Sequence, residues 1–320
     1  MPPASTLSAL SSLMIQNLSV LMSSIQSFAR FDLIMIGPCY ARHLAQMLHR
    51  GERYVLQIDS HMRFRPNWDE YLIRQLNKTE NPERSVLTAY PPGYEPPRGP
   101  GPDAETRGTV LVPWKFAEDG MLRQKGRLIR PDYHRRDAPE GDESDDNVPC
   151  LLYAGGFNFS RSSLLDVCPY DRELHGLFFG EEISMGARLY THGVDLYAPP
   201  ETVCYHLWRR NPLRAKDDTD EEMMGRREES REVVRMQLRG TGRGLGTVRS
   251  VEQFATKLGV DFERRTLAPG CEDAGLGADA FVSPMSRGSI KEEKTKHCSE
   301  MDRDDLTSVL QLVGQFMRDR

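Results

Sequence analysis

Apolar residues in the first third of the chain follow two different periods. Residues 38–50 carry apolar side chains at helical spacing, with a proline in the first turn and Gly51 at the end, and this pattern predicts a helix. The apolar run Tyr54–Ile58 that follows is too short for a helix and suits a buried strand. Helix, turn and buried strand make half of a βαβ unit, so the pattern indicates an α/β fold.

Later segments repeat this alternation. Asn67 and Glu70 have the spacing of an N-cap and an acid in the first turn, so a helix is expected to begin there. Ser250 is expected to cap another short helix in the same way. Further strands are predicted at 85–90, 108–112, 194–198 and 202–208, and another begins at residue 151 and ends at the paired glycines Gly155–Gly156. Further helices are predicted at 178–192, 217–239 and 251–258.

Shifts in composition divide the chain into three parts. Residues 1–31 are rich in serine, show weak periodicity and are predicted to be disordered. Residues 32–265 hold the periodic segments and form the predicted domain, which is interrupted by a proline-rich loop at 91–102 and an acidic stretch at 131–149. Residues 266–320 predict a mostly disordered tail, with one short amphipathic helix at 306–317.

Two potential metal ligands follow the strand at 54–58. In open α/β sheets ligands collect beyond the carboxyl ends of the strands, and Asp59 and His61 occupy that position. Since they are two residues apart on an extended chain, we expect their side chains to point the same way. A carboxylate and an imidazole so placed can share one metal ion.

Composition narrows the class of protein. The 320 residues are 38% hydrophobic, enough for one full core, and the net charge of -5 with interspersed signs does not predict a nucleic-acid surface. The six cysteines form no Cys-X-X-Cys pair, which favours reduced thiols and a cytoplasmic location. There is no run of 18 or more apolar residues, so no membrane-spanning helix is predicted in this chain.

Several motifs in sequence order resemble one known family. The segments 37–42, 57–64 and 205–206 resemble the Skp1-type hydroxyproline N-acetylglucosaminyltransferases, and the Asp-Ser-His triplet at 59–61 is shared more distantly with polypeptide N-acetylgalactosaminyltransferases. The resemblance implies a GT-A-like fold, that is, a Rossmann-like mixed sheet flanked by helices. It also implies a retaining, manganese-dependent transferase that moves N-acetylglucosamine from UDP-GlcNAc to a hydroxyproline of a Skp1-like protein acceptor.

The resemblance also assigns roles to individual residues. It makes His206 the third metal ligand beside Asp59 and His61, and Glu181 and Glu182 the catalytic acids. The residues expected to bind the donor are Arg42, Asp59, Gly155, Gly156, Trp208 and Arg209.

Each of these assignments has a plainer alternative. A lone histidine such as His206 can be a hydrogen-bonded core residue, and paired glycines can mark a tight turn. Acids in a first helical turn complement the helix dipole, which is worth only about 0.3 to 1 kcal/mol each. Arg209 can be surface charge.

The start of the chain departs from the family pattern. Only 58 residues precede Asp59, whereas two strand-helix units of roughly 30 residues each are expected there. We therefore expect part of the amino-terminal nucleotide-binding half to be missing. This leaves a second hypothesis, a non-catalytic remnant that binds a protein partner. A third, a metallohydrolase that activates water at Asp59, His61 and His206, lacks the further ligand cluster such a site needs.

Overall fold

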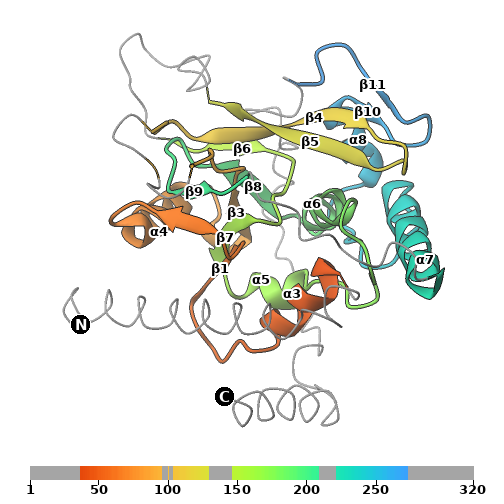
Figure 1. Cartoon of the computed structure of the whole chain (residues 1–320), viewed down its shortest axis with the longest axis horizontal. Helices are drawn as coiled ribbons and strands as arrows, with labels where there is room; N and C mark the ends of the chain where they lie inside the picture. The colour runs from red at the N-terminus through yellow and green to blue at the C-terminus, as the bar shows by residue number, and fades with distance from the viewer. Residues whose placement is uncertain (1–36, 96–99, 101–103, 130–145, 209–220, 273–320) are drawn as a thin grey trace.

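A computed structural model describes residues 37–95, 100, 104–129, 146–208 and 221–272 of the chain (Figure 1). The predicted segments 1–31 and 306–317 and Arg209 lie outside these residues. Within the described residues no helix combines the length and the apolar character that crossing a membrane requires.

A five-stranded mixed sheet forms the centre of the molecule (Figure 1). Its order is β1, β7, β3, β8, β6, where β3 and β8 pair in parallel and the other neighbours are antiparallel. β1, β3 and β8 therefore run in one direction, and β7 and β6 in the other. The strands are β1 (Tyr54–Ile58), β3 (Ser85–Thr88), β6 (Val148–Cys150), β7 (Phe157–Arg161) and β8 (Asp195–Ala198).

Three two-stranded ladders surround this sheet in the described part of the chain. The longest is the β4–β5 hairpin, which lies across the top of the view in Figure 1, close to the β10–β11 ladder and α8. The ladders pair β4 (Thr109–Phe116) with β5 (Leu122–Leu128), β2 (Met62–Phe64) with β9 (Cys204–His206), and β10 (Val260–Asp261) with β11 (Thr266–Leu267).

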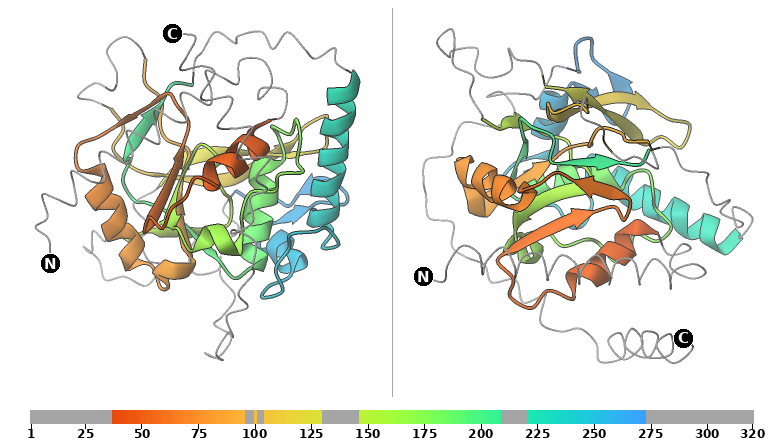
Figure 2. Two further views of the ribbon diagram at one scale, coloured as in Figure 1. Left: turned by 90° about the horizontal axis from the view of Figure 1, so that it is seen from below. Right: turned by 60° about the vertical axis from the view of Figure 1, so that its left-hand side comes forward.

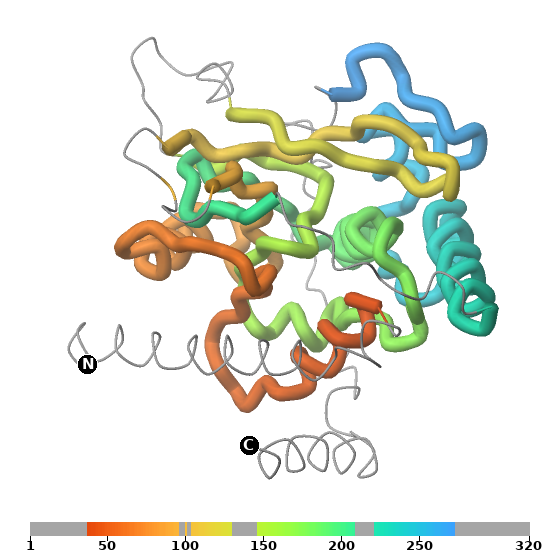
Figure 3. The backbone as a smooth tube through the Cα atoms, viewed as in Figure 1, coloured from red at the N-terminus to blue at the C-terminus, as the bar shows by residue number. Residues whose placement is uncertain are grey.

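Helices lie on both sides of the central sheet, as the further views and the tube trace show (Figures 2 and 3). α6 is the most deeply placed, since every one of its residues except Glu182 is buried, and it packs against α7 and α8. α4 packs near β3 on the other side. The helices are α3 (Pro38–Gln46), α4 (Trp68–Lys78), α5 (Leu164–Val167), α6 (Glu181–Thr191), α7 (Glu221–Leu238) and α8 (Val251–Leu258), with a 3₁₀ turn at Pro82–Arg84.

Two apolar clusters hold these layers together. The larger one joins α6 to β4, β6, β8 and α8 and includes the fully buried Leu111, Leu152 and Phe254. The smaller one lies between α4 and the sheet and includes Leu72 and Phe157. The mixed sheet with helices packed on both of its sides confirms the predicted α/β fold.

Several predicted elements have different limits. α3 ends at Gln46 rather than residue 50, and Asn67 begins α4 in the left-handed region without a side-chain capping bond. The strand predicted to begin at residue 151 and to end at Gly155–Gly156 was placed too early, because these glycines precede β7 instead of ending a strand. By contrast, Ser250 is the N-cap of α8, as the sequence predicts, and it forms a full capping box with Gln253.

Only the first strand of the β4–β5 hairpin was predicted from the sequence. β4 runs on to Phe116 past a bulge near Pro113, and β5 was missed altogether. β5 is mostly polar, with charged or polar residues from Arg123 to Lys125, so it has no apolar alternation by which a strand is detected.

Candidate metal and donor site

The candidate site lies at one edge of the central sheet. β1 and β3 end there, and β7, which runs the opposite way, begins there. Asp59 directly follows β1, Tyr90 lies two residues beyond β3, and the pair Gly155–Gly156 directly precedes β7. The Asp59 N–H donates to the Gly156 carbonyl at 3.1 Å, which continues the β1–β7 ladder into the site.

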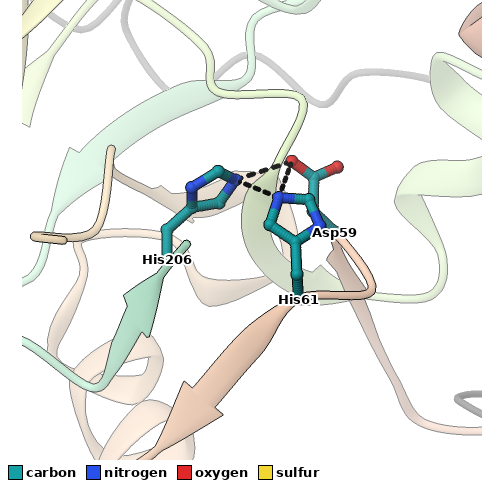
Figure 4. A group of neighbouring side chains, drawn as sticks. All are labelled: Asp59, His61 and His206. Carbon is teal, nitrogen blue, oxygen red and sulfur yellow. Dashed lines mark hydrogen bonds and ion pairs between the residues drawn. The ribbon is translucent and has the colours of Figure 1, made fainter. Parts of the chain in front are cut away.

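Asp59, His61 and His206 converge at this edge (Figure 4). His206 Nε2 lies 3.1 Å from Asp59 Oδ2 and 2.7 Å from His61 Nε2, and His61 Nε2 lies 4.0 Å from Asp59 Oδ2. One potential ligand atom from each residue therefore falls within 4.8 Å of the other two. The structure thus brings together the three residues that the sequence predicts as metal ligands, although they are 147 positions apart at the extremes.

A turn, not an extended chain, brings His61 to Asp59. The chain turns at Ser60 and His61 before β2 begins at Met62, so the expected extended geometry is wrong. β2 pairs with β9 so that Met62 lies opposite His206, and the Leu207 N–H donates to the His61 carbonyl at 3.2 Å. The β2–β9 ladder therefore sets the distance between the two imidazoles.

The chemistry of this donor set fits a divalent cation. Two imidazole nitrogens only 2.7 Å apart repel each other unless a proton or a metal ion lies between them. The other ring nitrogen of His206, Nδ1, is buried without a hydrogen-bond partner among the described residues, so the protein does not fix its tautomer by that route. His206 is only 5% exposed, whereas the Asp59 side chain is 31% exposed and keeps the trio open to solvent on one side.

Local charges keep Asp59 ionised. Burial alone would raise the pKa of its carboxyl, but the hydrogen bond from His206 and the positive charge of Arg42 lower that pKa below its ordinary value. Arg42 Nη2 lies 3.5 Å from Asp59 Oδ1. A carboxylate that is anionic at neutral pH is the form that binds a cation.

Arg42 joins the metal trio to the acid at the start of α6. Its Nη1 forms a close ion pair with Glu181 Oε1, and Tyr170 Oη donates to the same oxygen at 2.7 Å. Gln57 in turn donates to Tyr170 Oη at 2.9 Å. Both Arg42 and Glu181 are nearly buried, so a chain of polar contacts runs from Asp59 into the interior.

The two adjacent acids of α6 point to different partners. Glu182 Oε1 accepts the Gly155 N–H at 2.8 Å, and Glu182 Oε2 accepts from Tyr90 Oη and, at 3.1 Å, from Gln124 Nε2. Burial raises the pKa of the Glu182 carboxyl, and the hydrogen bonds from Tyr90 and Gly155 oppose that rise without cancelling it. Both acids predicted as catalytic therefore lie at this edge of the sheet.

Gly155 and Gly156 lie where a side chain has no room. A Cβ on Gly156 would lie 2.9 Å from Asp59 Oδ2. One on Gly155 would lie 2.6 Å from Arg42 Nη1 and 2.8 Å from Glu181 Oε1. Glycine at these two positions therefore lets the backbone approach the charged side chains of the site.

Trp208, two residues beyond the end of β9, borders the site. Its ring lies 3.9 Å from the His206 ring, its Nε1–H donates to the Pro91 carbonyl at 3.0 Å, and half of its surface is exposed. An exposed indole against His206, a potential metal ligand, offers a flat apolar surface to a ligand. The neighbouring Arg209, also predicted to bind the donor, is outside the described residues.

Four polar residues of the site were not identified from the sequence: Gln57, Tyr90, Gln124 and Tyr170. Gln57 had a usable signal, because it is two residues before Asp59 on the same strand and so faces the same way. Gln124 lies on the strand that was missed. Tyr90 falls at the end of the strand predicted at 85–90 and Tyr170 lies in an irregular segment, and neither position belongs to a motif that marks a functional residue.

Comparison with known proteins agrees with this arrangement. The family model "Glycosyltransferase (GlcNAc)" matches residues 16–243, more than half of the chain, and the chain belongs to this family. The matched range begins inside the segment 1–31 and ends before residue 265. No curated protein matches the chain.

Among solved structures, one similar chain is described as GalNAc-T7 with UDP, GalNAc and Mn²⁺. It is 16% identical, with a TM-score of 0.41, and the match covers 71% of this chain and 36% of the other. The chain therefore spans about a third of the length of that protein.

Proposed function

We propose that this chain transfers N-acetylglucosamine from UDP-GlcNAc to a protein hydroxyl, with retention of configuration, using manganese or another divalent cation. The observation that carries the proposal is the convergence of Asp59, His61 and His206 beside Arg42 in a member of the GlcNAc glycosyltransferase family. The metal, the donor and the acceptor are the proposed parts. Membership of a glycosyltransferase family is the established part.

In this proposal the cation is held by Asp59 Oδ2, His61 Nε2 and His206 Nε2. When bound, it supplies positive charge that stabilises the diphosphate leaving group of a nucleotide sugar. Arg42 keeps Asp59 anionic and holds Glu181 in place, because its guanidinium contacts both carboxylates. Trp208 excludes water from one side of His206.

The donor sugar is proposed to lie against Gly155 and Gly156. Their lack of side chains lets Arg42, Glu181 and Asp59 lie directly against this backbone, so these charged groups border the proposed sugar position. The proposed acceptor is a hydroxyproline of a Skp1-like protein. A cytoplasmic location belongs to the same proposal, and the five described cysteines, all buried free thiols, are compatible with it.

Donor choice can be tested without an acceptor. The purified chain is incubated with manganese and UDP-GlcNAc, UDP-GalNAc or UDP-glucose, and the UDP released by slow donor hydrolysis is measured. UDP-GlcNAc is expected to be cleaved fastest, and the reaction is expected to stop when the metal is chelated. Equal or absent release from all three donors would contradict the proposed activity.

The acceptor needs a matched pair of substrates. A Skp1-like protein carrying hydroxyproline is compared with the same protein carrying unmodified proline, each with labelled UDP-GlcNAc. Incorporation only into the hydroxylated protein supports the proposed acceptor. Incorporation into neither protein, with donor hydrolysis intact, would contradict the acceptor while leaving the donor assignment in place.

A further inference from the structure

Tyr90 and Gln124 reach the site from separate elements and have no role in the function proposed above. Tyr90 lies in the segment after β3, and Gln124 lies on β5 of the hairpin. Both donate to Glu182 Oε2, and Gln124 Nε2 also lies 3.1 Å from Tyr90 Oη. These three side chains form one polar cluster at the start of α6.

This cluster holds the backbone before β7. Glu182 accepts the Gly155 N–H at 2.8 Å, and Gln124 Nε2 donates to the Tyr153 carbonyl at 2.7 Å. From the other side, Gln57 Nε2 donates to the Gly155 carbonyl at 2.7 Å. Side chains of β1 and α6 therefore fix the peptide groups on both sides of Gly155, and Gln124 of β5 fixes the preceding peptide group at Tyr153.

The position of Gly155 matters because it has almost no free space. A Cβ on Gly155 would lie less than 3 Å from Arg42 and Glu181, and a Cβ on Gly156 would lie equally close to Asp59. A small shift of this backbone would therefore move the Arg42–Glu181 pair and the surface offered to the sugar. The two imidazoles of the metal trio, in contrast, are positioned by β2 and β9.

The hydrogen bonds separate the two neighbouring acids by role. Glu181 contacts Arg42, which contacts the metal ligand Asp59. Glu182 accepts hydrogen bonds from three donors, two side chains and the Gly155 N–H, and none of the three belongs to the metal trio.

We propose that Tyr90 and Gln124 are positioning residues for the donor sugar, acting through Glu182 on the backbone of Gly155. This rests on the proposed function, since it assumes that a nucleotide sugar lies beside Gly155. It also revises the role of Glu182, which holds the sugar-binding backbone while Glu181 faces the metal side of the site.

The test compares two variants that each remove one tyrosine hydroxyl. Tyr90→Phe removes the bond to Glu182 and keeps the ring, which packs 5.7 Å from Trp208. Tyr190→Phe on α6 is the matched control, because the Tyr190 hydroxyl is buried and has no hydrogen-bond partner among the described residues. Gln124→Ala and the double variant Tyr90→Phe/Gln124→Ala complete the set.

Affinities for UDP and for UDP-GlcNAc are measured by calorimetry with manganese, together with the rate of UDP release. Tyr90→Phe is expected to leave UDP affinity unchanged and to lower both the preference for UDP-GlcNAc over UDP and the hydrolysis rate by about tenfold. The double variant is expected to lose more than either single variant, and Tyr190→Phe to behave like the unaltered chain.

Two results would overturn the inference. One is a Tyr90→Phe variant that matches Tyr190→Phe in sugar preference and rate. The other is a Tyr90→Phe variant in which UDP and UDP-GlcNAc affinities fall together with the melting temperature, which is the pattern of a merely structural hydroxyl. Absence of manganese-dependent UDP binding by the unaltered chain would instead overturn the proposed function, and with it the role of this cluster.

Discussion

At the scale of single residues, the site depends on glycines, whose missing side chains leave room for its charged groups. Gly156 lies against Asp59 Oδ2, and β7 begins at the next residue. A methyl group there must displace the carboxylate, because the backbone of the β1–β7 ladder cannot move away. Metal coordination needs each ligand held within about 0.5 Å of its place, so the displacement should weaken binding.

Gly156→Ala is therefore expected to lower manganese affinity by roughly tenfold or more. Gly225→Ala on α7 is the control, since a Cβ there would touch nothing within 4 Å. The control should leave metal affinity unchanged and raise the free energy of unfolding by about 0.5 to 1 kcal/mol, because alanine favours a helix interior. Calorimetry with manganese and urea denaturation measure both effects. Equal metal affinity in the two variants would contradict the role given to Gly156.

The site residues that could be identified from the sequence are those that belong to a recognisable metal-binding motif. Asp59 and His61 were identifiable because two potential metal ligands follow a buried strand, and His206 because the resembling family has a ligand at that position. The turn that joins Asp59 to His61 was not predicted, since nothing in an Asp-X-His triplet distinguishes a turn from an extended segment. Tyr90 and Gln124 were missed because a hydrogen bond between distant segments leaves no periodic trace in the sequence.

At the scale of elements, the β4–β5 hairpin matters most because it carries Gln124. Asp119 holds its turn: the carboxylate accepts from Arg123 at 2.6 Å and from the Met121 N–H at 3.0 Å. Burial raises the pKa of Asp119, but these bonds and the nearby charge of Arg231 lower it below 3.8 overall. Because the folded-state pKa is depressed, this stabilisation is present above the ordinary pKa and is lost as the pH falls through the folded value.

Asp119→Asn should therefore lower the free energy of unfolding at pH 7 by about 1 kcal/mol. The difference between the variant and the unaltered chain should shrink below pH 3.8, the ordinary aspartate value, because the native carboxyl then becomes protonated too. Urea denaturation over a pH series measures this. A difference that stays constant through the acid range would show that the carboxylate charge does not stabilise the hairpin.

Elements with strong local signals were predicted well and the others were not. β1 and the N-cap Ser250 were predicted directly from an apolar run and a capping residue. The β4–β5 hairpin was obscured by a proline at a bulge and by the polar side chains of β5. Its turn, Asp119-Gly120, was the available signal, since an Asp-Gly pair between strands is typical of hairpins.

At the scale of the whole molecule, the site is assembled from segments between Arg42 and Trp208. The mixed direction of the central sheet makes this possible, since strands β1 and β3 end where β7 begins. That antiparallel insertion of β7 was not predicted from the sequence, because the direction of a strand depends on contacts between distant segments. The predicted incompleteness of the amino-terminal nucleotide-binding half stays a prediction.

The most direct test of the account is calorimetric titration of UDP into the protein with and without manganese. We expect binding that requires the metal in the unaltered chain and is lost in His206→Ala. His49→Ala, which removes an imidazole that contacts Glu52 outside the site, should bind as the unaltered chain does. UDP binding that is independent of manganese, or undiminished in His206→Ala, would contradict the assignment of Asp59, His61 and His206 as the metal centre of a glycosyltransferase.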